Sequence, residues 1–110
     1  MKEGEVYLAE FRDPKGREIK KDRRVVIIKN FVGYGVVFAV PISTGDKRFA
    51  EPFNVPLLKT ETNGLDEDSV AVTYQGTTLD KEERLKKKLG ELDNNSFELI
   101  KINLRKQLGL

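Results

Sequence analysis

The chain has 110 residues, close to the commonest size of one domain, and 35% of them are charged while 38% are hydrophobic. It contains no Cys and no His, which excludes disulfides, thiolate chemistry, the usual zinc ligand and the usual proton carrier at neutral pH. No apolar run approaches the roughly 20 residues that span a bilayer, and the N-terminal residues lack the apolar stretch of a signal peptide. We therefore expect one soluble, cytoplasmic domain over residues 1–110.

The net charge of +2 conceals a cluster of cations between Arg12 and Arg24. Seven cations and three anions lie in this stretch, an excess of four positive charges, so the remainder of the chain is net negative. Clustered cations raise the local concentration of an anionic partner. Because the cluster ends where the apolar run "RVVIIKN" begins, it predicts an anion site at the start of a buried strand.

Alternating or β-branched apolar runs predict five short strands. They are "EVYLAEF" (5–11), "RVVIIKN" (24–30), "VVFAVPIS" (36–43), "FNVPLL" (53–58) and "SVAVTYQ" (69–75). Pro41 predicts that the third strand lies at an edge or leaves the sheet at that point. Gly, Pro and Asp between the runs predict a small, strongly curved antiparallel sheet of the SH3-like barrel type.

Two helices are predicted in the C-terminal third of the chain. Asp80 and Glu83 fit a capping box that opens "KEERLKKK", with Gly90 as a plausible stop. Asp93 can cap a longer helix, with Leu92 and Phe97 as a hydrophobic staple. One face of this helix is apolar and predicts packing on the sheet, with a partner-binding face as the alternative; it carries Phe97, Ile100, Leu104 and Leu108. Strands followed by helices make the fold class α+β.

Several short motifs occur in a fixed order along the chain. They are "GEVYLAEF", "GRE", Arg23 ahead of "RVVIIKN", "VVFAVPIS", "GLDEDSVAVTYQGTTLDKEERLKKKLGELD" and "RKQLGL". In this order they resemble the MazF/PemK family, the toxins of type II toxin–antitoxin pairs that act as sequence-specific mRNA endoribonucleases. The resemblance covers nearly the whole chain.

The resemblance implies a small curved antiparallel sheet with short helices, a fold shared with the CcdB and Kid toxins. It also implies a homodimer that binds single-stranded mRNA in a groove at its interface, and a cognate MazE-like antitoxin with an acidic C-terminal segment. Cleavage would need no metal or other cofactor and would leave a 2′,3′-cyclic phosphate and a 5′-hydroxyl.

The resemblance also assigns site residues. Arg23 falls on the active-site arginine, Ser43 on the hydroxyl residue that ends the third strand, and Glu18 on the loop glutamate. The chain departs from the family pattern at two positions, with Arg24 in place of a proline and Thr77 in place of an arginine. Expected RNA contacts are Arg17, Lys20, Lys21, Arg24, Thr44, Lys47, Arg48, Gln75 and Thr78.

These residue types suit transesterification. Attack of a ribose 2′-hydroxyl on the neighbouring phosphate builds negative charge on the non-bridging oxygens, and the guanidinium of Arg23 can meet two of them. The hydroxyl of Ser43 can donate to the same phosphate. Glu18 is the obvious carboxylate base, but nearby cations should lower its pKa and make it a weak one, so its role can instead be to orient Arg23 or the 2′-hydroxyl.

Other interpretations stay open. A CcdB-like topoisomerase poison would share the fold without needing a phosphate clamp. An RNA-binding barrel without cleavage would agree with the departures at Arg24 and Thr77. Arg23 could also be a strand-end cation paired with Asp22 or Glu18. No metal site is predicted, because "DEDS" at residues 66–69 fits no Ca²⁺ loop.

Overall fold

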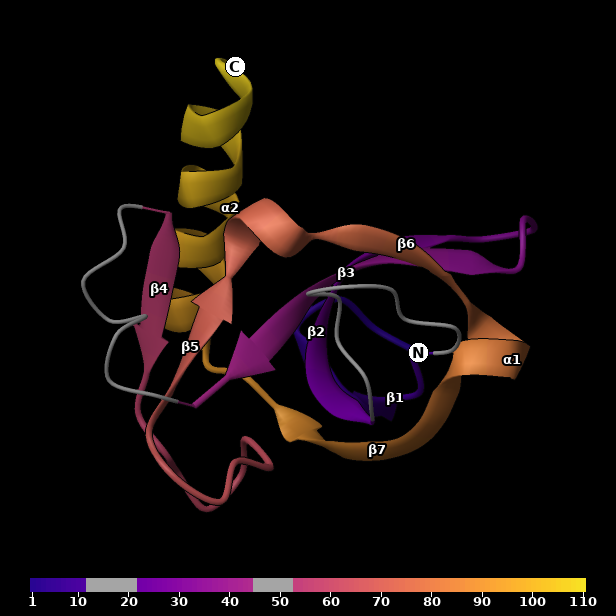
Figure 1. The fold of residues 1–110 in the computed structure, drawn as a ribbon, viewed down its shortest axis with the longest axis horizontal. Helices are drawn as coiled ribbons and strands as arrows, with labels where there is room; N and C mark the ends of the chain where they lie inside the picture. Colours follow the sequence, from indigo (N-terminus) through magenta and orange to yellow (C-terminus); the bar gives the residue numbers. More distant parts are fainter. Residues whose placement is uncertain (12–21, 45–52) are drawn as a thin grey trace.

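The computed structural model describes residues 1–11, 22–44 and 53–110 of the chain. Within them a seven-stranded sheet has the strand order β4-β5-β3-β2-β1-β7, and β6 pairs with β3 outside this path (Figure 1). The sheet curves strongly but does not close into a barrel, so the α+β curved sheet is confirmed. The strands are β1 (Glu5–Ala9), β2 (Arg23–Phe31), β3 (Val36–Ser43), β4 (Asn54–Leu57), β5 (Ser69–Val72), β6 (Thr77–Asp80) and β7 (Leu85–Glu91).

Strand β2 forms the centre of the core because its side chains are buried on both faces. Val25 and Ile27 belong to one hydrophobic cluster and Val26 to the other, and all three are fully buried. Successive residues of a strand point to opposite faces, so a strand covered on both sides is continuously apolar. Between Arg24 and Lys29 the strand therefore has no polar residue.

Strand β3 changes partners at Pro41. Its pairing with β2 ends at the Val25–Pro41 pair, and its pairing with β5 begins at Ile42, which lies opposite Ala71. The expectation that β3 lies at an edge is therefore wrong, because β3 is internal to the sheet. The alternative, that the strand leaves the sheet at Pro41, holds only in that the strand leaves its neighbour β2 there; it stays in the sheet by pairing with β5.

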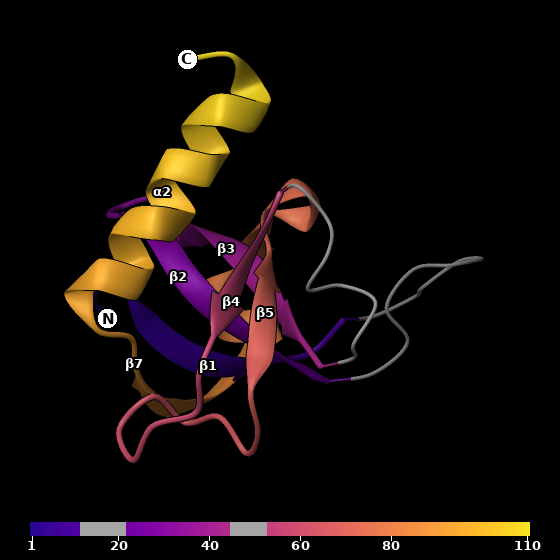
Figure 2. The same cartoon turned by 90° about the vertical axis from the view of Figure 1, so that its left-hand side faces the viewer.

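Helix α2 (Asn94–Leu108) packs on the sheet through the predicted apolar face (Figure 2). The Asp93 carboxylate accepts hydrogen bonds from the backbone N–H and the hydroxyl of Ser96, at 3.1 and 2.7 Å, which confirms the predicted cap. Ile100 and Leu104 are buried in the core cluster that also holds Val26 and Ile42. Leu108 is 63% exposed, so the apolar face ends before it. No helix in the described ranges is long and apolar enough to cross a membrane.

The predicted helix "KEERLKKK" is wrong beyond its first turn. Helix α1 covers only Lys81–Arg84, and the Asp80 carboxylate caps it by accepting from the N–H groups of Glu82 and Glu83, both at 2.9 Å. The following residues form β7 and pair with β1. This pairing brings Leu85 opposite buried Ala9, a tertiary contact that outweighs the helical propensity of the lysines.

Three further expectations from the sequence differ from the structure. "SVAVTYQ" is a strand only as far as Val72, and the 3₁₀ turn η2 (Thr73–Gln75) follows it. The short strand β6 was not expected. Gly90 does not end a helix. A side chain there would place its Cβ 2.6 Å from the backbone of Asn63, so the residue permits a close approach between β7 and the β4–β5 connection.

Candidate functional site

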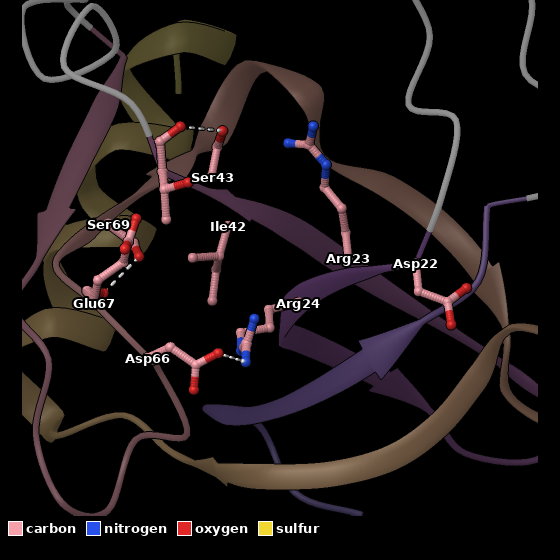
Figure 3. A pocket seen from close by; sticks show the side chains of 9 residues that line it. Asp22, Arg23, Arg24, Ile42, Ser43, Asp66, Glu67 and Ser69 are labelled. Atoms are coloured by element: carbon pink, nitrogen blue, oxygen red, sulfur yellow. Dashed lines mark hydrogen bonds and ion pairs between the residues drawn. The ribbon is translucent and has the colours of Figure 1, made fainter.

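A cavity of about 590 Å³ opens where β2 begins and β3 ends (Figure 3). Three separate segments line it, namely the entry to β2, the end of β3 and the turn that leads into β5. The lining residues are Asp22, Arg23, Arg24, Ile42, Ser43, Thr44, Asp66, Glu67 and Ser69.

Strand register brings these segments together. Val25 pairs with Pro41 in the antiparallel β2–β3 ladder, so the start of β2 lies beside the end of β3. Arg23 and Ser43 are each two residues beyond that pair, and side chains two apart on a strand share a face. Ser43 in turn pairs with Val70, which places the turn before β5 at the same rim.

Arg23 is held at the first position of a buried strand. It pairs with Ala9 of β1, and Val25, Val26 and Ile27 further along the strand are fully buried. Its half-buried side chain extends from β2 into the cavity on the side where Ser43 lies (Figure 3). The structure therefore brings together the arginine and the hydroxyl that the sequence predicted as partners.

Two serine hydroxyls contribute to the cavity from neighbouring strands. Ser43 is 9% exposed, and its hydroxyl donates to the carbonyl oxygen of Thr44 at the long distance of 3.3 Å. Ser69 is 2% exposed and donates to the carbonyl oxygen of Glu67 at 2.8 Å. The weaker bond leaves the Ser43 hydroxyl easier to redirect toward a ligand than that of Ser69. Thr44 is exposed at the rim.

The side chain of Arg24 makes contacts within the protein. Its Nε donates to the carbonyl oxygen of Gly64 at 2.9 Å, and a terminal nitrogen forms an ion pair of 2.6 Å with the Asp66 carboxylate. As the next residue along the strand, it points to the face opposite Arg23 (Figure 3). The guanidinium predicted to contact RNA thus ties the turn before β5 to β2.

The remaining predicted contacts lie elsewhere. Gln75 ends η2, and its side-chain oxygen is buried without a hydrogen-bond partner among the described residues. Thr78 is exposed on β6 and pairs with Phe38. Neither residue lines the cavity. The other predicted residues lie outside the described ones, and they are Arg17, Glu18, Lys20, Lys21, Lys47 and Arg48.

The sequence analysis missed the acidic side of the cavity. Asp66 and Glu67 line it, although their turn was considered only as a possible metal site. Within the described ranges, no group of acidic residues has an arrangement that could hold a metal ion. The sequence carried no local signal for this, because the turn reaches the cavity only through the pairing of β5 with the end of β3.

The fold and much of the sequence match known toxins. The endoribonuclease MazF of Staphylococcus saprophyticus is 37% identical over 113 residues, which cover 100% of this chain and 92% of that protein. MazF (Form-I) from Deinococcus radiodurans has the same fold, with a TM-score of 0.80 at 21% identity, covering 98% of this chain and 96% of that one.

A complex is also among the similar structures. MazE-MazF (Form-II) from Deinococcus radiodurans gives a TM-score of 0.76 at 19% identity over 98% of this chain and 94% of that chain. The family model described as PemK-like, MazF-like toxin of type II toxin–antitoxin system matches residues 2–108. This span confirms the resemblance drawn from the motifs, and the chain belongs to the PemK-like, MazF-like toxin family of type II toxin–antitoxin systems.

Proposed function

We propose that the protein is a sequence-specific endoribonuclease, the toxin of a type II toxin–antitoxin pair, which cleaves single-stranded mRNA in the cytoplasm. The observation that carries this proposal is the placement of Arg23 and Ser43 in one cavity at the start of a buried strand. The family membership and the 37% identical relative, which is named an endoribonuclease, support it.

The proposed reaction is attack of a ribose 2′-hydroxyl on the adjacent phosphorus atom. The new P–O bond forms as the bond to the 5′-oxygen of the next nucleotide breaks, which leaves a 2′,3′-cyclic phosphate and a 5′-hydroxyl. The proton of the 2′-hydroxyl goes to a base, and the leaving oxygen takes a proton. No metal ion takes part in this scheme.

Arg23 would stabilise the charge that develops during this step. A guanidinium can donate two parallel hydrogen bonds to the non-bridging oxygens, and a strand that is buried on both faces fixes its origin before the substrate arrives. The Ser43 hydroxyl would donate to the same phosphate from the neighbouring strand. Glu18 remains the proposed base or orienting group.

Three partners complete the proposal. RNA would bind at the cavity, a second copy of the chain would form a homodimer, and an antitoxin with an acidic segment would cover the same cations. One of the similar structures is a complex of MazE with MazF, which supports the antitoxin. A monomer by sedimentation at micromolar concentration would contradict the dimer.

The test is incubation of the purified protein with a long RNA in excess EDTA, followed by mapping of the cleaved ends. We expect cuts at a short recurrent sequence with 5′-hydroxyl ends. Arg23→Ala should abolish them, and Ser43→Ala should slow them roughly 100-fold, as for loss of one donor to a transition-state oxyanion, while Ser43→Thr retains activity.

The control variant is Arg105→Ala, which removes a cation of the same kind from the exposed side of α2. It should cleave like the wild type. Retarded RNA mobility without cleavage would indicate an RNA-binding protein instead. Cleavage that persists in Arg23→Ala with an intact fold would overturn the assigned role of Arg23.

A further inference from the structure

The lining of the cavity carries charges of both signs. Arg23 extends into it from β2, and Asp22 lines it just before that strand. Glu67 and Asp66, which is paired with Arg24, form its acidic wall at the turn before β5. Ile42 lies between the two sides, as Figure 3 shows, and contributes apolar surface. A phosphodiester alone needs only the cationic wall. A nucleotide carries both an anionic phosphate and a flat, hydrogen-bonding base, and these two parts match the two walls.

One carboxylate on the acidic side is available to a ligand. Asp66 is bound by Arg24 at 2.6 Å, and the Asp68 carboxylate accepts the backbone N–H of Lys59 at 2.8 Å. The Glu67 side chain is exposed and makes no hydrogen bond or ion pair with the described part of the chain. The fold therefore uses the carboxylates on either side of Glu67 and leaves that of Glu67 at the cavity.

The backbone that carries Glu67 is held in place. Its carbonyl oxygen accepts a hydrogen bond of 2.8 Å from the buried hydroxyl of Ser69. Asn63, which is 4% exposed, bonds three backbone groups of the same connection, the N–H of Thr60, the N–H of Leu65 and the carbonyl of Leu58. A fixed backbone limits where the carboxylate can reach, as discrimination between ligands requires.

Chemistry decides what this carboxylate can recognise. An ionised carboxylate accepts hydrogen bonds and cannot donate them, so it repels phosphate oxygens and base carbonyls. It accepts well from an exocyclic amino group, as in the pairing of Glu or Asp with N4 of cytosine. Uracil carries a carbonyl oxygen at the corresponding position.

We propose that Glu67 is a specificity-determining residue, which selects cytosine over uracil at the base next to the phosphate that Arg23 contacts. Ile42 would contact the ring of the base, and the Glu67 carboxylate would accept its amino group. This inference rests on the proposed ribonuclease function, and it names the part of the RNA that the acidic wall reads.

The test compares base preference rather than total activity. After the cleavage sequence of the wild type is mapped, short RNAs are made in which each position flanking the cut carries cytosine or uracil in turn. The kcat/KM ratio of cytosine to uracil at each position is measured for wild type, Glu67→Gln, Glu67→Lys and the control Glu61→Gln. Glu61 is exposed on the same connection and does not line the cavity.

We expect the wild type to favour cytosine over uracil at one flanking position by on the order of tenfold or more, a typical discrimination for one base contact. Glu67→Gln should reduce the ratio several-fold while cleavage continues. Glu67→Lys should invert it, because an ammonium donates to the uracil oxygen and repels an amino group. Glu61→Gln should keep the wild-type ratio. A general gain in RNA affinity from the added lysine charge cancels in the ratio.

The outcomes separate the two proposals. If the wild type cleaves RNA and the ratio is the same in all four proteins, the role of Glu67 is overturned while the nuclease stands. If the wild type cleaves no RNA, the proposed function fails, and the same ratio is taken from binding of labelled oligonucleotides. A cytosine preference in binding that Glu67→Lys inverts would then still support base reading by Glu67, and equal ratios would overturn it.

Discussion

Arg23 and Arg24 are neighbours in the chain, but their side chains have different tasks because successive residues of a strand face opposite sides. Arg23 enters the cavity from the first position of β2. Arg24 contacts the carbonyl of Gly64 and the carboxylate of Asp66. The resemblance leads to the expectation of a proline at this position, and proline offers no side-chain donor. In this chain the second arginine therefore adds a link between β2 and the acidic wall.

This link gives a prediction for Arg24. Arg24→Ala removes one hydrogen bond and one partly exposed ion pair, so we expect the free energy of unfolding to fall by about 1 kcal/mol. Cleavage should decrease far less than in Arg23→Ala, because the lost contacts are within the protein. Urea denaturation and initial cleavage rates measure the two effects. Complete loss of cleavage with unchanged stability would show that Arg24 contacts the RNA directly.

At the scale of elements, local sequence patterns predicted the helix caps correctly but failed for β7. Asp80 and Asp93 were predicted as helix caps, and both carboxylates accept backbone N–H groups in those roles. These are local interactions, and a short motif encodes them completely. Residues 85–88 were predicted as helix for the same local reasons, but they belong to β7, whose conformation depends on pairing with β1, about eighty residues earlier.

The candidate site likewise contains residues that the sequence predicted and residues that it did not. Arg23 and Ser43 were predicted because the first begins a recognisable strand, the second ends one, and both match positions that the resemblance assigns. Asp66 and Glu67 were missed because their importance arises from the Ser43–Val70 pair, a register that no local pattern specifies. The role of Arg24 was also hidden, since its partners Gly64 and Asp66 are distant in sequence. The curvature of the sheet was predicted from the Gly, Pro and Asp residues between the apolar runs.

The β1–β7 pair contains a buried carboxylate. The Glu5 side chain is 7% exposed and forms an ion pair of 2.7 Å with Lys88. Burial by itself raises the pKa of Glu5, but the hydrogen bonds from the Lys88 ammonium and the Lys2 backbone N–H outweigh burial and lower the pKa below its ordinary 4.5. The hydrogen bond to Glu5 raises the pKa of Lys88. Both side chains are therefore charged across the neutral range.

This pair predicts how stability depends on pH. Because the pKa of Glu5 is lower in the folded state, its contribution is present above the ordinary 4.5 and is lost as the pH falls through the lowered value. Because the pKa of Lys88 is raised, its contribution is lost only as the pH rises through a value above 10.5. We expect Glu5→Gln to unfold at a lower temperature than wild type at pH 7 and to lose less stability below pH 4.5. Thermal melts across pH test this, and parallel wild-type and variant curves would contradict it.

For the whole molecule, the uneven distribution of charge matters more than the net charge of +2. The stretch from Arg12 to Arg24 carries an excess of four positive charges and leads into β2, where Arg23 lines the cavity. An RNA strand or an acidic antitoxin segment would meet the same cations. Electrostatic binding of this kind releases counterions, so affinity depends on salt.

The corresponding prediction concerns affinity at increasing salt. The Kd for a non-cleavable RNA should rise steadily as NaCl is increased, with log Kd linear in log salt, and Arg23→Ala should reduce the slope. The complex with an antitoxin should weaken in the same range. Fluorescence anisotropy gives the slopes for both, with Arg105→Ala as the control that keeps the wild-type slope. Salt-independent binding would count against docking at the cation cluster.

The order of synthesis gives the core a further consequence. Ile42, which lines the cavity, shares one hydrophobic cluster with Val26 and with Ile100 and Leu104 of α2. A nascent chain emerges from the ribosome N-terminus first, so the lining of the cavity leaves the exit tunnel before α2 is available to cover this cluster. The supporting core is completed only once α2 has also left the tunnel. A nascent chain that ends before α2 therefore lacks the complete core beneath the cavity where RNA cleavage is proposed.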